Sequence, residues 1–502
     1  MEENKNNITR KSFIKNTALT SAGFYIVPRH VLGGKGYVAP SDKLYIACVG
    51  CGGEAENDIH HYATAPKKNA VIAYLCDVDD RMAAPRRKEF PNAKFYYDWR
   101  EMFEKENKHF DAVSVAIPDH NHAIVGLNAM QLRKHLYLQK PLTHDIYEAR
   151  ILTQAAEKYK VVTQMGDQGA SCDGMRTLRE WFEAGLIGDI THVYNWTNRP
   201  VWPQGIPWPS AKPPVPKELK WDLWLGTAQY VDYVDNLVPF NWRGWWQFGT
   251  GALGDMACHI IGPSFKLLEL GYPTEVTCSA TVVYSGIFKE ADFPDSIPPS
   301  SVLRYTFKLK DGRDLKLYWM DGGIAPDRPD ELDPDVNMND ALAFVPEENS
   351  FEGGTIFVGT KGKAACGWGG AYPKLLPLSL NKDIHIPQKY PRVPGGMDGH
   401  WWQWIDACIA GYGNMEVDSP FVGYAGPLTE TVLMGNLLLR CFNMRKTNKR
   451  HDPVYGDVED ITNPGRYIAY KWDGENMRIT NFEAANQFVK REYRQGWGEL
   501  KL

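Results

Sequence analysis

The architecture first becomes visible in the stretch Leu44-Tyr-Ile-Ala-Cys-Val-Gly-Cys-Gly-Gly-Glu-Ala55, an apolar run followed by a cluster of glycines. Gly50, Gly52 and Ala55 occupy the small-residue positions of the G-x-G-x-x-G/A dinucleotide fingerprint. Gly50 permits a tight turn, Gly52 lets backbone N–H groups approach a pyrophosphate, and Ala55 allows a helix to pack closely on a strand. With Gly53 beside them, these residues predict a phosphate-binding turn at a helix N-terminus, where unpaired N–H groups favour an anion.

A second apolar run, Ala70-Val-Ile-Ala-Tyr-Leu-Cys76, supplies the context that a glycine turn alone lacks, because it ends in Asp77. An acidic residue at the tip of the second strand can accept hydrogen bonds from both ribose hydroxyls and repels a 2′-phosphate. The sequence therefore favours NAD over NADP as the cofactor. The simpler alternative is a βαβ turn that binds no nucleotide.

Strands and helical patterns alternate after a linker at residues 33–41, as in a doubly wound parallel sheet. Further buried strands are expected at Phe110–Ile117, His135–Pro141 and Lys160–Met165. Ligands of such sheets bind outside the carboxyl ends of the strands. Four candidate cofactor-binding residues fall at those ends: Pro118, His122, Lys140 and Gln168.

The pattern changes near residue 170 and predicts an α+β domain built on a mostly antiparallel sheet. After a helix at residues 174–184, β-like runs occur at residues 190–196, 274–285, 301–309, 315–320 and 355–359. Helices are expected at 401–409 and 427–442. We divide the chain into an export signal and linker (1–40), a cofactor-binding domain (41–168), a substrate domain (169–450), and a C-terminal extension that packs on the body (451–502).

The composition of the chain is typical of a globular protein and argues against several other classes. The chain has 502 residues, of which 43% are hydrophobic and 23% charged, as in a globular protein. A net charge of −5 without a basic stripe gives no reason to expect a nucleic-acid partner, and no apolar run reaches membrane-spanning length. The nine cysteines form no disulfide framework, and we predict no metal site.

The N-terminus contains Thr9-Arg-Lys-Ser-Phe-Ile-Lys15, which is similar to a twin-arginine export signal with Lys11 in place of the second arginine. A weakly apolar stretch follows at residues 17–27. This pattern favours a periplasmic protein, exported already folded and therefore retaining its NAD tightly. The alternative is a basic tail on a cytoplasmic protein.

Two segments could carry chemistry. Lys140 ends a buried strand before a proline, where an ammonium can bind a substrate hydroxyl and stabilise alkoxide charge; otherwise it is a surface lysine. Asp255 and His259 are four residues apart and share one helix face. His259 could take the hydroxyl proton while Asp255 orients it or binds a neighbouring hydroxyl. The structural alternative is a helix cap and a core histidine.

Tryptophans crowd the region before Asp255. Indole faces pack against the C–H faces of sugar rings, so one or two of these tryptophans could line a saccharide site while most serve as core anchors. The candidate substrate residues are Asn198, Arg199 and Trp245, with Gln204 as a further polar neighbour.

Together these elements resemble the Gfo/Idh/MocA oxidoreductase family. The resemblance covers nearly the whole chain after the signal and includes the glycine fingerprint, Asp77, Pro118-Asp-His-Asn-His122, Gln139-Lys-Pro141 and Asp255-x-x-x-His259. The family usually has Glu-Lys-Pro where this chain has Gln139. The resemblance implies a Rossmann domain followed by an open antiparallel sheet. It also implies a catalytic group of Lys140, Asp255 and His259, with His122 near the nicotinamide ribose.

The export-like start and tryptophan-rich insert resemble those of secreted bacterial carbohydrate enzymes. The resemblance implies NAD-dependent oxidation of a secondary hydroxyl, at C3 of a glucoside or disaccharide, to a 3-keto-glycoside. One alternative is a glycosidase that oxidises C3 transiently, eliminates and reverses both steps; another is a non-catalytic carbohydrate or NAD sensor. The expected partners are a saccharide, a separate electron acceptor or second sugar, and a further copy of the chain.

Overall fold

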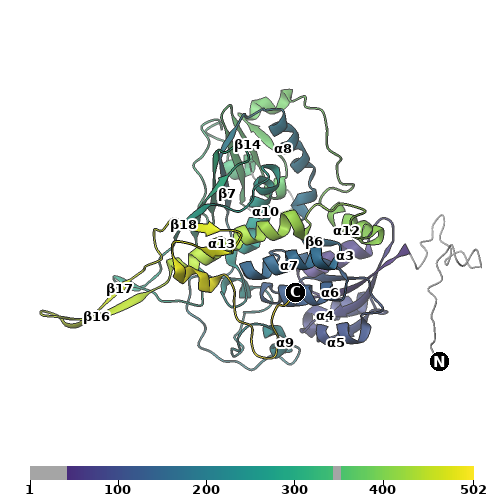
Figure 1. Cartoon of the computed structure of the whole chain (residues 1–502), viewed down its shortest axis with the longest axis horizontal. Coiled ribbons are helices and arrows are strands. Elements are labelled where there is room, and N and C mark those ends of the chain that lie inside the picture. The colour runs from purple at the N-terminus through teal and green to yellow at the C-terminus, as the bar shows by residue number, and fades with distance from the viewer. Residues whose placement is uncertain (1–41, 343–351) are drawn as a thin grey trace, which may run out of the picture. The chain divides into compact units, whose positions relative to one another are not determined.

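The computed structural model describes residues 42–342 and 352–502, so the predicted export signal lies outside the described residues. The first sheet has six parallel strands in the order β3-β2-β1-β4-β5-β6 (Figure 1). Its strands are β1 (Leu44–Val49), β2 (Ala70–Cys76), β3 (Lys94–Tyr96), β4 (Ala112–Val115), β5 (His135–Gln139) and β6 (Thr163–Gly166). This is the doubly wound Rossmann order, with a topological switch point between β1 and β4.

Helices connect these strands and cover the sheet. They are α3 (Glu54–Ala63), α4 (Asp80–Glu89), α5 (Trp99–Glu106), α6 (His122–Gln131) and α7 (Ile146–Tyr159). Helix α7 begins with a capping box: Asp145 accepts a hydrogen bond from the Glu148 backbone N–H at 2.9 Å, and Glu148 accepts one from the Asp145 N–H at 3.3 Å. Two backbone donors that the helix leaves unpaired are thereby satisfied, which fixes where α7 starts.

The second sheet has nine strands in the order β15-β14-β13-β7-β12-β11-β8-β18-β19. Neighbours pair antiparallel except β7 and β12, which are parallel. The strands are β7 (Ile190–Thr197), β8 (Glu275–Ala280), β11 (Ser301–Lys308), β12 (Asp314–Met320), β13 (Gly353–Gly359), β14 (Lys363–Cys366), β15 (Lys374–Leu376), β18 (Tyr470–Asp473) and β19 (Arg478–Ile479). The predicted fold class, a Rossmann domain followed by a mostly antiparallel sheet, is confirmed.

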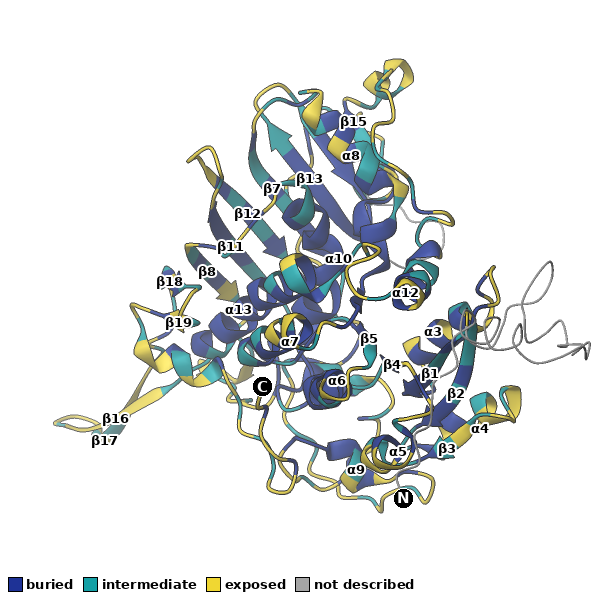
Figure 2. Ribbon diagram, turned by 45° about the vertical axis from the view of Figure 1, so that its right-hand side comes forward, coloured by how far each residue is buried: buried dark blue, intermediate teal, exposed yellow. Residues whose placement is uncertain are grey.

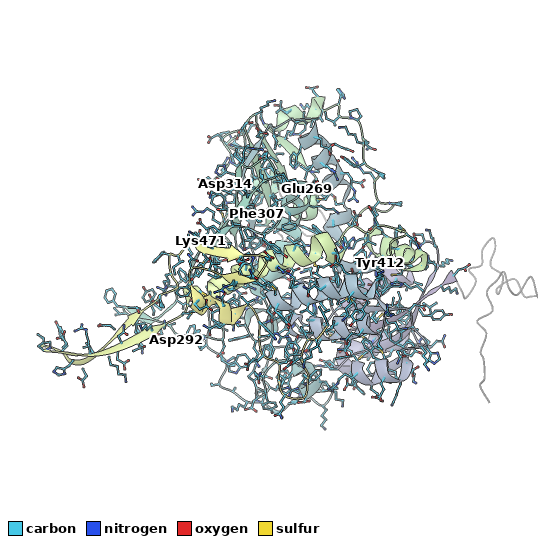
Figure 3. The ribbon with its side chains drawn as sticks, viewed as in Figure 1. Glu269, Asp292, Phe307, Asp314, Tyr412 and Lys471 are labelled. Atoms are coloured by element: carbon cyan, nitrogen blue, oxygen red, sulfur yellow. The ribbon has the colours of Figure 1, made fainter. Side chains whose placement is uncertain are left out.

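Helices cover one face of the second sheet (Figure 2). They are α8 (Asp173–Glu183), α10 (Gly251–Leu267) and α13 (Gly426–Phe442), while α12 (Gly399–Ala410) packs on α3 of the Rossmann domain. Phe307 on β11 is buried in this core, and Asp314 lies where β12 begins (Figure 3). Because α10 and α13 belong to the same hydrophobic core as β4, β5 and α7, that core joins the two sheets.

Several shorter elements depart from the predicted pattern. The strand expected at 274–285 breaks after Ala280, where the chain leaves the sheet for the hairpin of β9 (Tyr284–Gly286) and β10 (Lys289–Glu290). The expected boundary at residue 450 falls inside β16 (Lys446–Asp452), which pairs only with β17 (Gly456–Thr462) among the sheets described. Two short helices remain, α9 (Trp221–Leu225) and α11 (Met338–Leu342).

Within the described part of the chain, none of the helices has the length and apolar character needed to cross a bilayer.

Candidate active site

The glycine turn is shaped by close backbone contacts. Gly50 has φ +103°, and a Cβ added to it would lie 2.1 Å from the carbonyl oxygen of Ala116. A Cβ on Gly52 would lie 2.6 Å from the sulfur of Met82 on α4. Gly53, at φ +57°, faces open space just before α3, and Ala55 is buried in the first turn of that helix. The turn therefore presents bare backbone at a helix N-terminus, which fits a diphosphate.

Asp77 lies beside this turn. Its Oδ2 accepts a hydrogen bond from the Cys51 N–H at 2.8 Å, and its Oδ1 accepts one from the Asp79 N–H at 2.9 Å. Burial raises the pKa of Asp77 to about 6, although both N–H donors favour the ionised form. A carboxylate fixed beside the glycine turn could accept hydrogen bonds from the ribose hydroxyls of a bound dinucleotide.

Lys140 and Asp255 meet at the carboxyl end of β5. The Lys140 Nζ donates to the backbone oxygen of Asp255 at 2.8 Å and to its Oδ1 at 2.9 Å. Asp255 is buried in the first turns of α10. Burial opposes its ionisation, but the charges of Lys140 and Arg243 outweigh burial, so the pKa of Asp255 falls to about 2. An ammonium has three N–H bonds, so one remains for a ligand.

His259 lies one helical turn beyond Asp255 on α10. Its Nδ1 lies 2.8 Å from Oδ1 of Asp167, which follows β6. The indole ring of Trp368 packs against the imidazole with 5.2 Å between ring centroids. Lys140, Asp255 and His259 are thus gathered where the parallel sheet meets α10.

The other predicted cofactor residues lie around the same strand ends. His122 Nδ1 is 2.9 Å from the Pro141 oxygen and its Nε2 is 2.7 Å from the Ile117 oxygen, so it ties the ends of β4 and β5 together. Pro118 precedes the short turn Asp119–Asn121. The Gln168 amide lies 3.4 Å from the Glu54 carboxylate at the start of α3.

The predicted saccharide residues come from the tryptophan-rich insert and from the chain that follows β7. Trp245 is 4% exposed and packs edge-on against Trp208, so it is a core anchor and does not offer a free face. The tryptophans of the insert at residues 202–246 are buried except Trp208, which is half-buried. Asn198 and Arg199 follow the end of β7, where the Asn198 N–H donates to the Glu352 oxygen at 2.7 Å.

Comparisons with known proteins agree with this fold. A family model described as an oxidoreductase family NAD-binding Rossmann fold matches residues 44–167, and a model of the family's C-terminal α/β domain matches residues 187–284. Both models describe the Gfo/Idh/MocA oxidoreductase family, so these two regions of the chain match that family. The predictions of that family and of an NAD-binding Rossmann domain are confirmed.

The individual relatives of this chain are distant in sequence. Levoglucosan dehydrogenase of Pseudarthrobacter phenanthrenivorans is 23% identical over 192 residues, 37% of this chain and 40% of that protein. Inositol 2-dehydrogenase/D-chiro-inositol 3-dehydrogenase of Lacticaseibacillus casei is 30% identical over 121 residues, 24% of this chain and 34% of that protein. The chain therefore spans about two fifths or less of these relatives' lengths.

A solved dehydrogenase structure shares the fold at low sequence identity. The WlbA dehydrogenase of Chromobacterium violaceum, in complex with NADH and UDP-GlcNAcA, has a TM-score of 0.50 at 16% identity, with 80% of this chain and 94% of that chain covered. Levoglucosan dehydrogenase in complex with NADH has a TM-score of 0.49 at 16% identity, with 78% and 96% covered.

The structure offers a reason for Gln139 in this chain, where the family usually has glutamate. The Gln139 Nε2 donates to Asp58 Oδ1 at 2.9 Å, and the Trp401 indole N–H donates to the same oxygen at 2.7 Å. Asp58 is fully buried, and burial raises its pKa well above its usual range. A glutamate at position 139 would place a second carboxylate against it, which an amide avoids.

Three residues near the site had escaped the sequence analysis. Arg243, from the tryptophan-rich insert, places its guanidinium 3.8 Å from Asp255 Oδ1 and 3.9 Å from Asp119 Oδ1. Asp167 and Trp368 both contact His259, although Asp167 lies far before it in the sequence and Trp368 far after it. Arg243 carried one usable signal, a lone cation among tryptophans just before the loop that opens α10.

Proposed function

We propose that this oxidoreductase uses NAD to remove hydride from a secondary hydroxyl, the C3 hydroxyl of a glucoside or disaccharide. The observation that carries the proposal is the Lys140–Asp255 pair, 2.9 Å apart at the carboxyl edge of the NAD-binding sheet. The same helix carries His259. An ammonium with one N–H to spare and an imidazole on the adjacent turn are the groups that alcohol oxidation needs.

Each side chain has a separate task in this proposal. NAD, when bound at the Gly50 turn, would supply the acceptor for the hydride. The spare N–H of Lys140 binds the reacting hydroxyl oxygen, and the ammonium stabilises negative charge as it develops there. His259 accepts the hydroxyl proton, and Asp255 holds the Lys140 ammonium in place by charge and hydrogen bonding.

The choice of sugar rests on family resemblance and on the aromatic surroundings of the site. Trp368 is half-buried, and its ring packs against His259. An aromatic face beside the base suits a sugar ring, whose C–H bonds pack on indole while its hydroxyls seek polar partners. Asp77 favours NAD over NADP because its carboxylate would repel a 2′-phosphate.

We also propose that the protein is exported to the periplasm. Export through the twin-arginine route would carry NAD inside the folded protein, so the nucleotide would stay tightly bound. Net oxidation then requires a second sugar or a separate electron acceptor to take the hydride back. A transient C3 oxidation followed by cleavage would need neither.

The test is to incubate the purified protein with 4-nitrophenyl glucoside and identify the products by mass spectrometry. A stable 3-keto-glycoside, formed when an electron acceptor is supplied, is the expected result. Free nitrophenol without any added cofactor would instead indicate the redox-neutral glycosidase. Binding of NAD and sugar with no product in either assay would indicate a sensor and contradict the proposal.

A further inference from the structure

Asp167 makes two hydrogen bonds that the proposed reaction has not yet used. Its Oδ1 lies 2.8 Å from Nδ1 of His259, and its Oδ2 accepts a hydrogen bond from the Tyr424 hydroxyl at 2.8 Å. Asp167 is 1% exposed. Both carboxylate oxygens are therefore held by side chains from other elements, and water is excluded from them.

Helix α10 leaves room for this arrangement. Gly262 lies one turn beyond His259, and a Cβ added there would be 2.7 Å from the Tyr424 hydroxyl and 3.4 Å from Asp167 Oδ2. Any larger residue at 262 would press on the tyrosine hydroxyl. Burial, with the Asp167 charge as a lesser cause, raises the pKa of Tyr424 well above its ordinary value. The phenol stays protonated and donates to the carboxylate.

We propose that Asp167 is a positioning residue that selects the tautomer of His259. A carboxylate accepts hydrogen bonds and donates none, so Nδ1 of His259 must carry the proton. The lone pair is then on Nε2, the nitrogen that can receive a proton from substrate. Once His259 is protonated, the same carboxylate lies beside the imidazolium and stabilises it. Tyr424 fixes the rotation of Asp167, so that Oδ1 stays aimed at the ring.

This inference rests on the proposed role of His259 as the base. The decisive variant is Asp167→Asn, since the amide can turn its NH₂ toward Nδ1 and donate to it. His259 would then adopt the opposite tautomer and present Nε2–H to the substrate, which cannot accept a proton. We expect kcat to fall about 10²- to 10⁴-fold, as for loss of general base catalysis, while the KM for sugar changes less than threefold.

The tautomer itself can be read without turnover. In protein labelled with ¹⁵N-histidine, the His259 signals are assigned by their loss in His259→Gln. We expect Nδ1–H in the parent and Nε2–H in Asp167→Asn. The matched variant Tyr424→Phe keeps the carboxylate, so it should retain Nδ1–H and lose less than tenfold in kcat.

The outcomes separate the two proposals. If Asp167→Asn keeps the parental tautomer, or keeps kcat within threefold of the parent, the role of Asp167 is wrong. If the tautomer switches in a protein that oxidises no sugar, the positioning role stands and the proposed function fails. Thermal unfolding of both variants shows whether the fold is retained, and the tautomer is read only on folded protein.

Discussion

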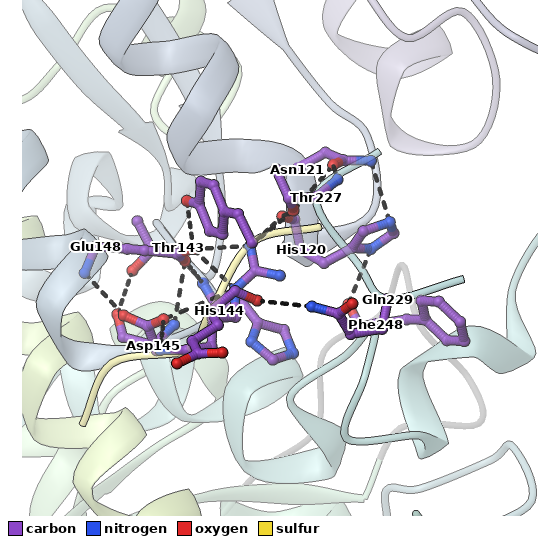
Figure 4. A network of polar contacts seen from close by, with 12 residues as sticks. His120, Asn121, Thr143, His144, Asp145, Glu148, Thr227, Gln229 and Phe248 are labelled. Carbon is purple, nitrogen blue, oxygen red and sulfur yellow. Dashed lines mark hydrogen bonds and ion pairs between the residues drawn. The ribbon is translucent and has the colours of Figure 1, made fainter. Parts of the chain in front are cut away.

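His120 and His259 are both buried near the ends of the parallel strands, yet their surroundings differ. Both ring nitrogens of His120 face backbone oxygens. Nδ1 lies 3.3 Å from the Phe248 oxygen (Figure 4), and Nε2 lies 3.0 Å from the Trp224 oxygen. For His259, only Nδ1 has a hydrogen-bond partner among the described residues. The two histidines occupy similar places in the fold, but only His259 has a ring nitrogen that could bind a ligand.

The network around His120 connects three parts of the chain. Asn121 and Thr227 join the Rossmann domain to the tryptophan-rich insert, through a hydrogen bond from the Thr227 N–H to Asn121 Oδ1 at 3.0 Å (Figure 4). Arg491 of the C-terminal region binds Glu148 at 2.9 Å and the Thr227 hydroxyl at 2.9 Å. Because these groups satisfy one another, the network stabilises the fold and has little capacity for chemistry.

The largest effect should come from Lys140→Met, which removes the spare N–H and the charge that stabilises the reacting oxygen. We expect kcat for sugar oxidation to fall about 10³-fold, as for loss of an electrostatic donor at a developing oxyanion. NAD should still co-purify, which a mass spectrum of the released nucleotide would show. Lys134→Met, at the opposite end of β5, is the control and should leave kcat within twofold. A similar loss in both variants would contradict the assignment.

The next largest effect should be on substrate affinity. Trp368→Ala removes the aromatic surface beside His259, and we expect the KM for sugar to rise about fivefold, since an aromatic contact contributes on the order of 1 kcal/mol. Trp245→Ala is the comparison, because that ring is buried in the core. It should lower the melting temperature without a selective change in KM. An unchanged KM in Trp368→Ala would place the sugar elsewhere.

A third effect concerns the pH dependence of NAD binding. The pKa of Asp77 is raised to about 6 by burial, and ribose hydroxyls need the ionised carboxylate as their acceptor. Protons therefore compete with NAD below this pH, and affinity should fall by up to about tenfold for each pH unit as pH drops below 6. Calorimetric titration of nucleotide-free protein measures this slope. In Asp77→Asn the affinity for NAD should be lower and nearly independent of pH. If the variant shows the same pH dependence as the parent, a group other than Asp77 causes it.

The smallest effect on turnover should come from His120→Asn. Burial lowers the pKa of His120 to about 3, far below its value in an unfolded chain. Between about pH 6.5 and 3 the unfolded state gains a proton that the folded state lacks, so the stability due to this group is present above 6.5 and is lost as pH falls. The variant should lose about 1–3 kcal/mol of unfolding free energy at pH 7, from unsatisfied partners, with an unchanged kcat.

The acid-induced loss of stability should also be shallower in His120→Asn than in the parent, as measured by urea unfolding at pH 7 and pH 5. If kcat falls while stability is unchanged, then His120 takes part in turnover. The contrast between His120, with both ring nitrogens hydrogen-bonded, and His259 would then be wrong.

Much of the fold could be predicted because its signals are contiguous in sequence. Gly50 ends an apolar strand, Asp77 ends the next, and Lys140 ends a later one, so each residue's place follows from local pattern alone. The burial of Trp245 was not visible in the sequence, because indole density does not reveal which rings are buried. The predicted boundary at residue 450 fell within a strand of the β16–β17 hairpin, because the polar sequence there gave no local sign of a strand.

Local sequence patterns were enough to locate the glycine turn, Asp77, Lys140 and the Asp255–His259 pair, because backbone geometry and helical spacing depend on a few neighbouring residues. Long-range packing establishes which histidine retains a nitrogen without a partner among the described residues, and which tryptophan lies beside it. Asp167 and His259 are separated by 92 residues, and His259 and Trp368 by 109. Hydrogen-bond saturation and burial depend on such distant contacts, so no local pattern encodes them.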